Sequence, residues 1–276
     1  NPMKGGILFA DYVTTVSPTY AKEILSPEYG MGLENVLAQR KDNLVGILNG
    51  IDVEVYNPAT DPHIYVNFTS EWEKKYANTK ALRKELNLED GQYPLIGLVS
   101  RFVEQKGIDL VACALDGIVD AGAQLVALGT GDKAYEELLS KKAREYPHMV
   151  SLNITFDPKL AQLIYAGSTH FLMPSRFEPC GLGQMIALRY GSIPIVRRTG
   201  GLADTVFDVD SEPNGNGFVF DEATADSVLG AVKRAVSYYK DERMHKNLFQ
   251  RAISSDVSWD KSARAYVELY ERAFYS

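Results

Sequence analysis

The segment at positions 174–184 carries side chains suited to binding sugars and phosphates, and it reads Pro-Ser-Arg-Phe-Glu-Pro-Cys-Gly-Leu-Gly-Gln. Its carboxylate, Glu178, stands just before a helical pattern that runs to Tyr190. The N–H groups of a first helical turn, which we place around Gly181 and Leu182, suit phosphate oxygens or sugar hydroxyls. Glu178 could accept hydrogen bonds from sugar hydroxyls, or it could serve as a structural cap.

Two positively charged side chains lie close together in the segment Ser-Arg-Phe-Val-Glu-Gln-Lys-Gly at positions 100–107. Arg101 offers a planar fork to phosphate oxygens and Lys106 a point charge, so the pair is able to bind a diphosphate. Gly107 would let the backbone turn closely around such a ligand. The alternative is that both are ordinary exposed bases in a surface loop.

A third segment, at positions 197–202, places Thr199, Gly200 and Gly201 beside two arginines. Glycines at this point permit close approach of the backbone to a ligand phosphate or hydroxyl. Phe156 could stack on a base or ribose, or it could pack in the core. We interpret Cys180 as a packed thiol, because no histidine pairs with it.

Alternating apolar and amphipathic segments predict the elements that position these residues: an α/β fold with a doubly wound parallel sheet. Such a sheet binds ligands beyond the carboxyl ends of its strands, where the segments above begin. The Gly-Thr-Gly-Asp turn at 129–132 is interpreted as a tight turn with Asp132 as helix cap. The expected strands are 95–99, 124–128, 149–153, 170–173 and 192–196, and the expected helices 108–121, 134–145, 158–166, 181–190, 223–239, 242–253 and 259–275.

Composition limits the classes of function. The chain has 276 residues, is 45% hydrophobic and 24% charged, and carries a formal charge of −7 with a pI near 5.2. Acids and bases are interspersed, which argues against nucleic acid as a partner. The apolar runs are too short to span a membrane, which argues against a membrane partner.

Several of these segments together resemble the bacterial glycogen synthase and plant or cyanobacterial starch synthase family along essentially the whole chain. The motifs that carry the resemblance are Thr15–Tyr20, Gly46–Asp52, Asn57–Asp61, Ser100-Arg101 with Gln105–Gly107, Pro174–Gln184 and Arg198–Leu202. The resemblance implies a GT-B architecture of two Rossmann-like domains. It also implies transfer of glucose, with retention, from ADP-glucose or in some members UDP-glucose to the non-reducing end of an α-1,4-glucan. No metal or other cofactor is expected.

The resemblance also assigns roles to individual residues. Glu178, Arg101 and Lys106 are the predicted catalytic residues, the two bases neutralising charge on the leaving diphosphate. The predicted donor-binding residues are Arg101, Lys106, Phe156, Glu178, Cys180, Gly181, Leu182, Thr199, Gly200 and Gly201. The chain has Ile186 where many related transferases carry a second glutamate, and Gly183 where the family usually has threonine.

We expect residues 1–60 to be a remnant of the N-terminal acceptor-side domain with its linker, which continues through Asp61–Ser70. Residues 61–256 would form the Rossmann-like nucleotide-sugar domain, and 257–276 a C-terminal helix that packs back on the first domain. Because the rest of the N-terminal domain would supply most of the glucan groove, we expect this chain alone to bind donor but to have little or no activity. The expected location is the plastid stroma or the bacterial cytoplasm.

Two alternatives remain open from the sequence. The chain could be a transferase of the sucrose synthase or trehalose-phosphate synthase kind that uses UDP-glucose. It could also be a non-catalytic nucleotide- or glucan-binding module. A glycosidase is disfavoured, because paired carboxylates facing one bond are not evident.

Overall fold

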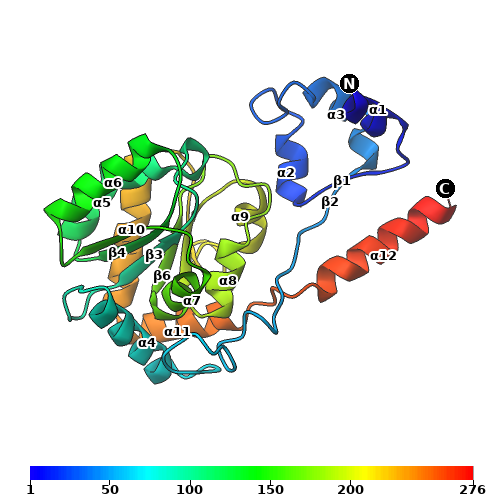
Figure 1. Ribbon diagram of the computed structural model, residues 1–276. Helices are drawn as coiled ribbons and strands as arrows, with labels where there is room; N and C mark the ends of the chain where they lie inside the picture. The colour runs from blue at the N-terminus through cyan, green and yellow to red at the C-terminus, as the bar shows by residue number, and fades with distance from the viewer. Residues whose placement is uncertain (276) are drawn as a thin grey trace.

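A six-stranded parallel sheet forms the centre of the computed structural model, which describes residues 1–275 (Figure 1). The strands are β3 (Leu95–Val99), β4 (Gln124–Gly129), β5 (Val150–Ile154), β6 (His170–Met173), β7 (Ile193–Arg197) and β8 (Phe218–Phe220). Their order is β5-β4-β3-β6-β7-β8. Successive strands are added on one side of β3 up to β5 and on its other side from β6 onward, so the strand order reverses between β3 and β6 while all strands stay parallel. The predicted doubly wound sheet is confirmed, and β8 adds an edge strand that we did not predict.

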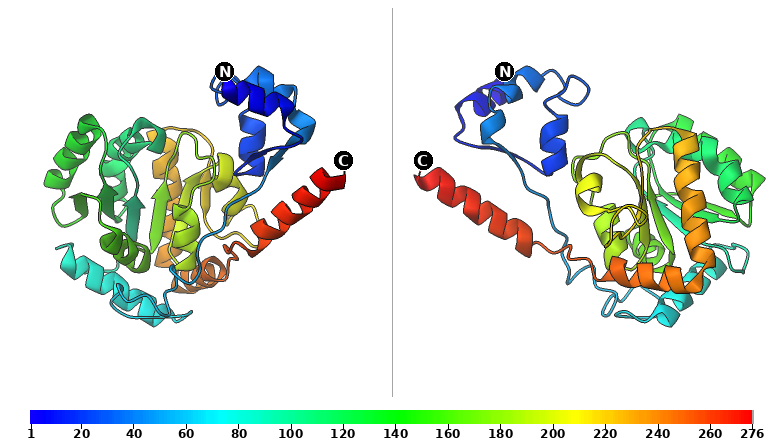
Figure 2. Two further views of the ribbon diagram at one scale, coloured as in Figure 1. Left: turned by 45° about the vertical axis from the view of Figure 1, so that its right-hand side comes forward. Right: turned by 180° about the vertical axis from the view of Figure 1, so that it is seen from behind.

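Helices cover both faces of this sheet (Figures 1 and 2). One face carries α5 (Ile108–Asp120), α6 (Lys133–Glu145) and α10 (Ala225–Lys240), and the other α7 (Pro158–Gly167) and α8 (Gly183–Arg189). Helix α4 (Trp72–Glu85) packs on α7. Because helices cover both faces, the strands are apolar along their whole length rather than at alternate positions.

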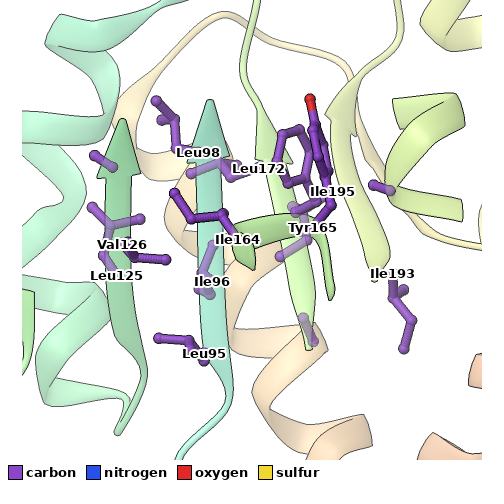
Figure 3. Packing of buried hydrophobic residues seen from close by; sticks show 14 of the residues in the cluster. Leu95, Ile96, Leu98, Leu125, Val126, Ile164, Tyr165, Leu172, Ile193 and Ile195 are labelled. Carbon is purple, nitrogen blue, oxygen red and sulfur yellow. The ribbon is translucent and has the colours of Figure 1, made fainter. Parts of the chain in front are cut away.

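The core lies between these layers, and Figure 3 shows part of its packing. Leu95, Ile96 and Leu98 of β3 are at most 2% exposed, as are Leu125 and Val126 of the neighbouring β4. Each side chain of this size contributes roughly 1.5–3 kcal/mol when it is removed from water. Strands β3 and β4 therefore hold the loops that follow them in fixed positions.

Two predicted helix starts differ in the structure. Helix α8 begins at Gly183 rather than at residue 181, because Gly181 has a φ of +74° and is left-handed. Gly181 and Leu182 thus precede the helix, contrary to the prediction that they form its first turn. Asp132 stands at the N-cap of α6 but makes no capping bond; Glu136 instead accepts a hydrogen bond from the Gly131 N–H at 3.1 Å.

Helix α4 was not predicted, because its buried face is largely polar. Lys75, Asn78 and Arg83 are buried on it. The Lys75 ammonium donates to the Tyr165 carbonyl at 3.0 Å and to Ser192 Oγ at 2.9 Å, which ties α4 to the sheet layer. A helix whose buried side chains are polar lacks the apolar periodicity that sequence reasoning depends on.

The first fifty residues form a small separate lobe (Figure 1). It contains α1 (Pro2–Phe9), β1 (Val13–Thr15), α2 (Pro18–Glu23), α3 (Glu34–Ala38), a 3₁₀ turn at Lys41–Asn43 and β2 (Leu44–Gly46), with β1 and β2 paired in parallel. Ser17 Oγ accepts a hydrogen bond from the Tyr20 N–H at 2.8 Å and so caps α2, whose first residue is Pro18.

Two extended segments of the chain, one around Ile51 and one around Val257, run side by side between the lobe and the sheet domain. The Ile51 N–H donates to the Val257 carbonyl at 2.9 Å, and a Cβ on Gly50 would lie 2.4 Å from the Ser258 backbone. Helix α11 (Glu242–Ile253) precedes this crossing and α12 (Asp260–Tyr275) follows it. The guanidinium of Arg272 on α12 stands 5.7 Å from the ring centre of Tyr12 in the lobe. Residue 276, the last of the predicted C-terminal segment, lies outside the described residues.

A cluster of buried titratable groups lies near the amino ends of the strands. His170 and His245 have ring centres 5.4 Å apart, and both are at most 2% exposed. Burial lowers the pKa of His170 well below its ordinary value and that of His245 to about 3, and Lys75 adds to both effects. Both imidazoles are therefore neutral in the folded protein at neutral pH.

This cluster predicts that the protein loses stability in acid. Because the folded pKa of His245 is about 3 and its ordinary value is 6.5, the unfolded chain binds a proton that the folded chain excludes. Between pH 6.5 and pH 5 this one group should lower the free energy of unfolding by roughly 1.5 kcal/mol. Urea unfolding at several pH values should show a shallower decline for His245→Phe and an unchanged one for the exposed His63→Gln. Equal declines in all three would contradict the assignment.

Candidate functional site

The loops that follow the neighbouring strands β3 and β6, between which the strand order reverses, are held together by hydrogen bonds. The Arg176 N–H donates to the Gln105 carbonyl at 2.8 Å, and Gln105 Nε2 donates to the Phe177 carbonyl at 3.2 Å. Gly107 has a φ of +66°, and a Cβ there would stand 2.3 Å from the Pro174 carbonyl oxygen. Glycine is needed at this position for both reasons, and it allows the two loops to meet.

An ion pair joins the same two loops. Lys106 Nζ lies 2.5 Å from Glu178 Oε2, and the side chains are 17% and 8% exposed. Ser175 Oγ donates to the same carboxylate oxygen at 2.9 Å. Partial burial makes this attraction stronger than it would be at a wet surface. Ser175 lies within a motif that sequence analysis selected, but its role in orienting Glu178 was not predicted.

Arg101 is exposed near this pair, and within the described part of the chain its guanidinium forms no ion pair. The neighbouring Arg176 differs, because it makes a bidentate pair with Asp109 at 2.8 and 2.7 Å. Arg176 holds the pKa of Asp109 below its usual range. Of these two arginines, Arg101 is the one whose charge remains available to an anion.

Two adjoining cavities open beside these residues, with volumes of about 270 and 500 Å³. They share a wall formed by Val99, Ser100, Arg101, Tyr165 and Ile186. The smaller cavity is also lined by Lys106, Glu178, Gly181 and Leu182, and the larger by Phe156. Six of the predicted site residues therefore line this pair of adjoining cavities, the donor hollow, at the carboxyl ends of the strands.

Phe156 occupies the rim of the larger cavity. Its side chain is 87% exposed, so the alternative that it packs in the core is wrong. Asp157, the next residue, caps α7 by accepting a hydrogen bond from the Leu160 N–H at 2.9 Å. The cap fixes the chain at this point and leaves the aromatic ring free to meet a ligand.

The other predicted site residues, Cys180, Thr199, Gly200 and Gly201, line neither cavity. A Cβ on Gly200 would stand 2.0 Å from the Glu178 carbonyl oxygen, and one on Gly201 would stand 2.0 Å from that of Cys180. These glycines therefore allow two segments of chain to pack together. Cys180 is 6% exposed, and burial raises the pKa of its thiol, which agrees with a packed thiol.

The two departures from the family pattern have visible consequences. Ile186, at the position of the second glutamate expected from many related transferases, presents an apolar side chain to both cavities. A Cβ on Gly183 would lie 3.2 Å from Met173 Sδ and 3.3 Å from the Phe171 ring. The glycine thus lets the start of α8 pack closely on β6, whereas a threonine would require these neighbours to shift.

The small lobe contacts the site through two short helices, α2 and α9 (Gly200–Thr205). Asp204, near the end of α9, accepts hydrogen bonds at the start of α2 from Ser17 Oγ (2.6 Å), the Thr19 N–H (3.0 Å) and Thr19 Oγ1 (2.6 Å). Glu23, at the end of α2, accepts hydrogen bonds at the start of α9 from Thr199 Oγ1 (3.0 Å) and the Gly200 N–H (2.9 Å). Each helix start is thus bound by a carboxylate from the other helix, a contact that sequence analysis missed.

Loss of one such carboxylate should loosen the lobe. Asp204→Ala removes three accepted hydrogen bonds at a helix start, so we expect roughly 1–3 kcal/mol less protection of the amides of residues 19–24 in hydrogen exchange. Asp221→Ala is the matched control, since Asp221 pairs with Arg198 on an exposed surface. Its effect should stay within about 0.5 kcal/mol. Equal protection in the two variants would refute the role of Asp204.

The fold and site define a class of protein, a doubly wound α/β domain with cavities at the carboxyl ends of its strands and a second lobe beside them. Residues 79–252 match the family model described as glycosyl transferases group 1, and residues 1–39 match that of the starch synthase catalytic domain. The chain belongs to the glycosyl transferases group 1 family.

Individual relatives narrow the likeness. The chain is 54% identical over 277 residues to a glycogen synthase of Thermosipho africanus, which covers 99% of this chain and 57% of that protein. A glycogen synthase of Geotalea daltonii is also 54% identical, covering 98% and 56%. The catalytic domain of starch synthase IV from Arabidopsis thaliana, solved bound to ADP and acarbose, superposes with a TM-score of 0.94 at 42% identity over 100% of this chain and 58% of that one.

These findings confirm the resemblance to glycogen and starch synthases. A sucrose-phosphate synthase from Thermosynechococcus elongatus shares the fold at a TM-score of 0.67, but at 21% identity that likeness concerns the fold alone. The chain spans a little over half the length of the glycogen synthases it matches.

Residues 1–275 contain neither a cluster suited to a metal ion nor a helix suited to crossing a membrane. No group of three or more His, Cys, Asp or Glu side chains there is placed to hold a metal ion. None of the helices in this range combines the length and apolarity needed to cross a membrane.

Proposed function

We propose that this chain binds the sugar-nucleotide donor of a retaining glucosyltransferase that extends an α-1,4-glucan. The single observation that carries the proposal is that Arg101, Lys106 and Glu178 line one cavity, beside a second one, where the strand order reverses between β3 and β6. The smaller cavity is of mixed character and includes the charged groups of Arg101, Lys106 and Glu178, whereas the larger is mainly apolar with Phe156 at its rim. A glucosyl diphosphate fits the first and a nucleoside the second.

The phosphates would lie between the two bases. Arg101 lines both cavities, so its guanidinium can reach phosphates that bridge them. Lys106 lines the smaller cavity and is already held by Glu178. As the bond between glucose and diphosphate breaks, negative charge grows on the leaving phosphate, and two fixed positive charges stabilise it without moving a proton. We propose this electrostatic role as the main catalytic contribution of the chain.

The glucose would be held beside Glu178. Ser175 and Lys106 both contact Oε2 of its carboxylate, which leaves Oε1 to accept a hydrogen bond from a sugar hydroxyl. Among the residues that line the smaller cavity, Glu178 is the sole carboxylate, and its Oε2 atom is engaged in the ion pair with Lys106. We propose that the acceptor hydroxyl attacks the face that the diphosphate leaves, which retains the configuration without a protein nucleophile. A trapped glucosyl adduct on the protein would contradict this step.

The nucleoside would occupy the larger cavity, with its base or ribose against Phe156. ADP is the proposed nucleotide, because the starch synthase with a TM-score of 0.94 was solved bound to ADP. No metal or other cofactor is assigned a role, since Arg101 and Lys106 supply the charge that the diphosphate requires. The bacterial sources of the curated relatives favour the bacterial cytoplasm over the plastid stroma as the location.

The glucan acceptor would enter between this donor site and the lobe that α2 belongs to. We propose that the remainder of an N-terminal domain completes this groove, because the chain covers 57% of a related glycogen synthase. Glucan elongation should then require the complete protein, whereas donor binding should be measurable with this chain. Elongation of a maltooligosaccharide by the complete protein with ADP-glucose tests the overall function, and its absence would refute it.

Removal of the unpaired guanidinium should weaken nucleotide binding. Arg101→Ala loses charge-assisted hydrogen bonds worth about 1.5–3 kcal/mol, so the Kd for ADP should rise by roughly 10- to 150-fold. Titration calorimetry with ADP, UDP and their glucose conjugates measures this change and compares the nucleotides. Arg198→Ala is the control, since Arg198 pairs with Asp221 at the surface. Equal affinities for the wild type and Arg101→Ala would remove Arg101 from the site.

Neutralising Glu178 should affect the two parts of the donor in opposite directions. Glu178→Gln keeps the side-chain shape but removes a negative charge 2.5 Å from Lys106, so ADP should bind roughly fivefold more tightly, about 1 kcal/mol. The ratio of ADP-glucose to ADP affinity should fall, because the amide is a weaker acceptor for sugar hydroxyls. The exposed Glu137→Gln should change neither quantity. Weaker ADP binding by Glu178→Gln would show that the carboxylate does not oppose the diphosphate.

A further inference from the structure

A third cavity, of about 520 Å³, lies at the other end of the sheet from the two cavities of the donor hollow. It is formed by the start of α4, the end of α10, the start of α11 and the segment that leads into β3, near the lower end of the sheet domain in Figure 1. Its lining residues are Trp72, Glu73, Tyr76, Gln92, Tyr239, Lys240, Glu242, His245 and Lys246. The volume is typical of small-molecule sites, and the proposed function makes no use of it.

Aromatic rings form the walls of this cavity. Trp72 and Tyr76, one helical turn apart on α4, are stacked with ring centres 6.1 Å apart and planes at 24°. Tyr239 faces them from α10. All three rings are only partly buried, although rings of this size gain most from full removal from water. Flat, half-exposed aromatic faces are suited to the apolar faces of sugar rings.

A buried polar side chain lies at the base of the cavity without a partner. His245 is 2% exposed, and neither of its ring nitrogens has a hydrogen-bond partner among residues 1–275. Its ring sits edge-on between Trp72 at 4.7 Å and Tyr239 at 4.9 Å. A buried unsatisfied polar group costs free energy. The two nitrogens are closed to solvent, so a ligand hydroxyl would remove this cost only where the neighbouring Trp72 or Tyr239 ring moves aside.

The charges around the cavity cancel. Lys246 pairs with Glu242 at 2.9 Å and Glu73 at 3.5 Å, which joins α11 to α4 across the rim. Lys240 and the amide of Gln92 complete the polar lining. A lining with two acids, two bases and one amide offers hydrogen bonds of both kinds but no net charge, which matches a neutral ligand rich in hydroxyls better than a nucleotide or a cation.

From these observations we propose that the cavity is an accessory site for a segment of α-glucan chain, remote from the donor hollow. The identity of the sugar rests on the proposed function, and the site itself rests on the aromatic walls, the unpartnered His245 and the balanced charges. Such a site would hold a long glucan to the protein while one of its ends reaches the donor site.

Tryptophan fluorescence tests the proposal directly, because the chain has two tryptophans, Trp72 and Trp259. In Trp259→Phe, all of the tryptophan emission comes from Trp72 in the cavity wall. Maltoheptaose should change this emission in a saturable way, and ADP should not. The reciprocal variant Trp72→Phe is the matched control and should show no response to maltoheptaose. No saturable change in Trp259→Phe would overturn the proposal.

Two variants in the same single-tryptophan background locate the site. Tyr76→Ala should weaken maltoheptaose binding by roughly fivefold or more and Gln92→Ala by less, whereas the exposed Tyr270→Ala on α12 should leave it unchanged. Circular dichroism confirms that each variant is folded. Unchanged affinity in both cavity variants would overturn the assignment. Aromatic walls also bind quaternary ammonium cations, so a response to tetramethylammonium in place of maltoheptaose would overturn it as well.

The outcomes separate this inference from the proposed function. Lys106→Ala should lose ADP binding in calorimetry and keep the full response of Trp72 to maltoheptaose. If the protein binds ADP and Trp72 stays silent, the accessory site is wrong and the donor site stands. If Trp72 responds and no nucleotide binds, the donor assignment fails and the glucan site stands.

Discussion

The ion pair between Lys106 and Glu178 is the interaction around which the site is built. It exists because β3 and β6 are adjacent parallel strands, so the loops that follow them lie next to each other at the same edge of the sheet. Gly107 allows the loops to touch, and Ser175 orients the carboxylate. Without a bound anion, Glu178 balances the lysine charge, so the site can hold a base in a partly buried position at low cost.

The second constraint is the pair of helices that joins the small lobe to the sheet. Glu23 and Asp204 each bind the start of the opposite helix, and Glu23 does so at Thr199 and Gly200, which pack against the backbone of residues 178–180. The position of the small lobe is therefore connected, through a few hydrogen bonds, to the segment that carries Glu178. In a two-domain transferase, such contacts would relate the closure of the domains to the shape of the donor site.

Sequence reasoning reached the layered fold because continuous apolar strands and amphipathic helices alternate along residues 95–253. It failed for α4, whose buried face carries Lys75 and Arg83, since a polar face gives no apolar periodicity. It also started α8 two residues early, because Gly181 was taken as helical although its backbone is left-handed. It assigned Thr199, Gly200 and Gly201 to the ligand, which stays a prediction; in the structure these residues make close contacts within the chain.

The sequence by itself determined the fold class, the family and the segments at which Arg101, Lys106 and Glu178 stand, because these depend on local patterns and short motifs. Only the tertiary structure decided which charges are paired and which are available: Arg176 is held by Asp109, whereas Arg101 is not. It also placed Phe156 at the surface and enclosed His245 between two aromatic rings. Pairing and burial depend on residues far apart in the chain, and their distances are set only when the layers pack.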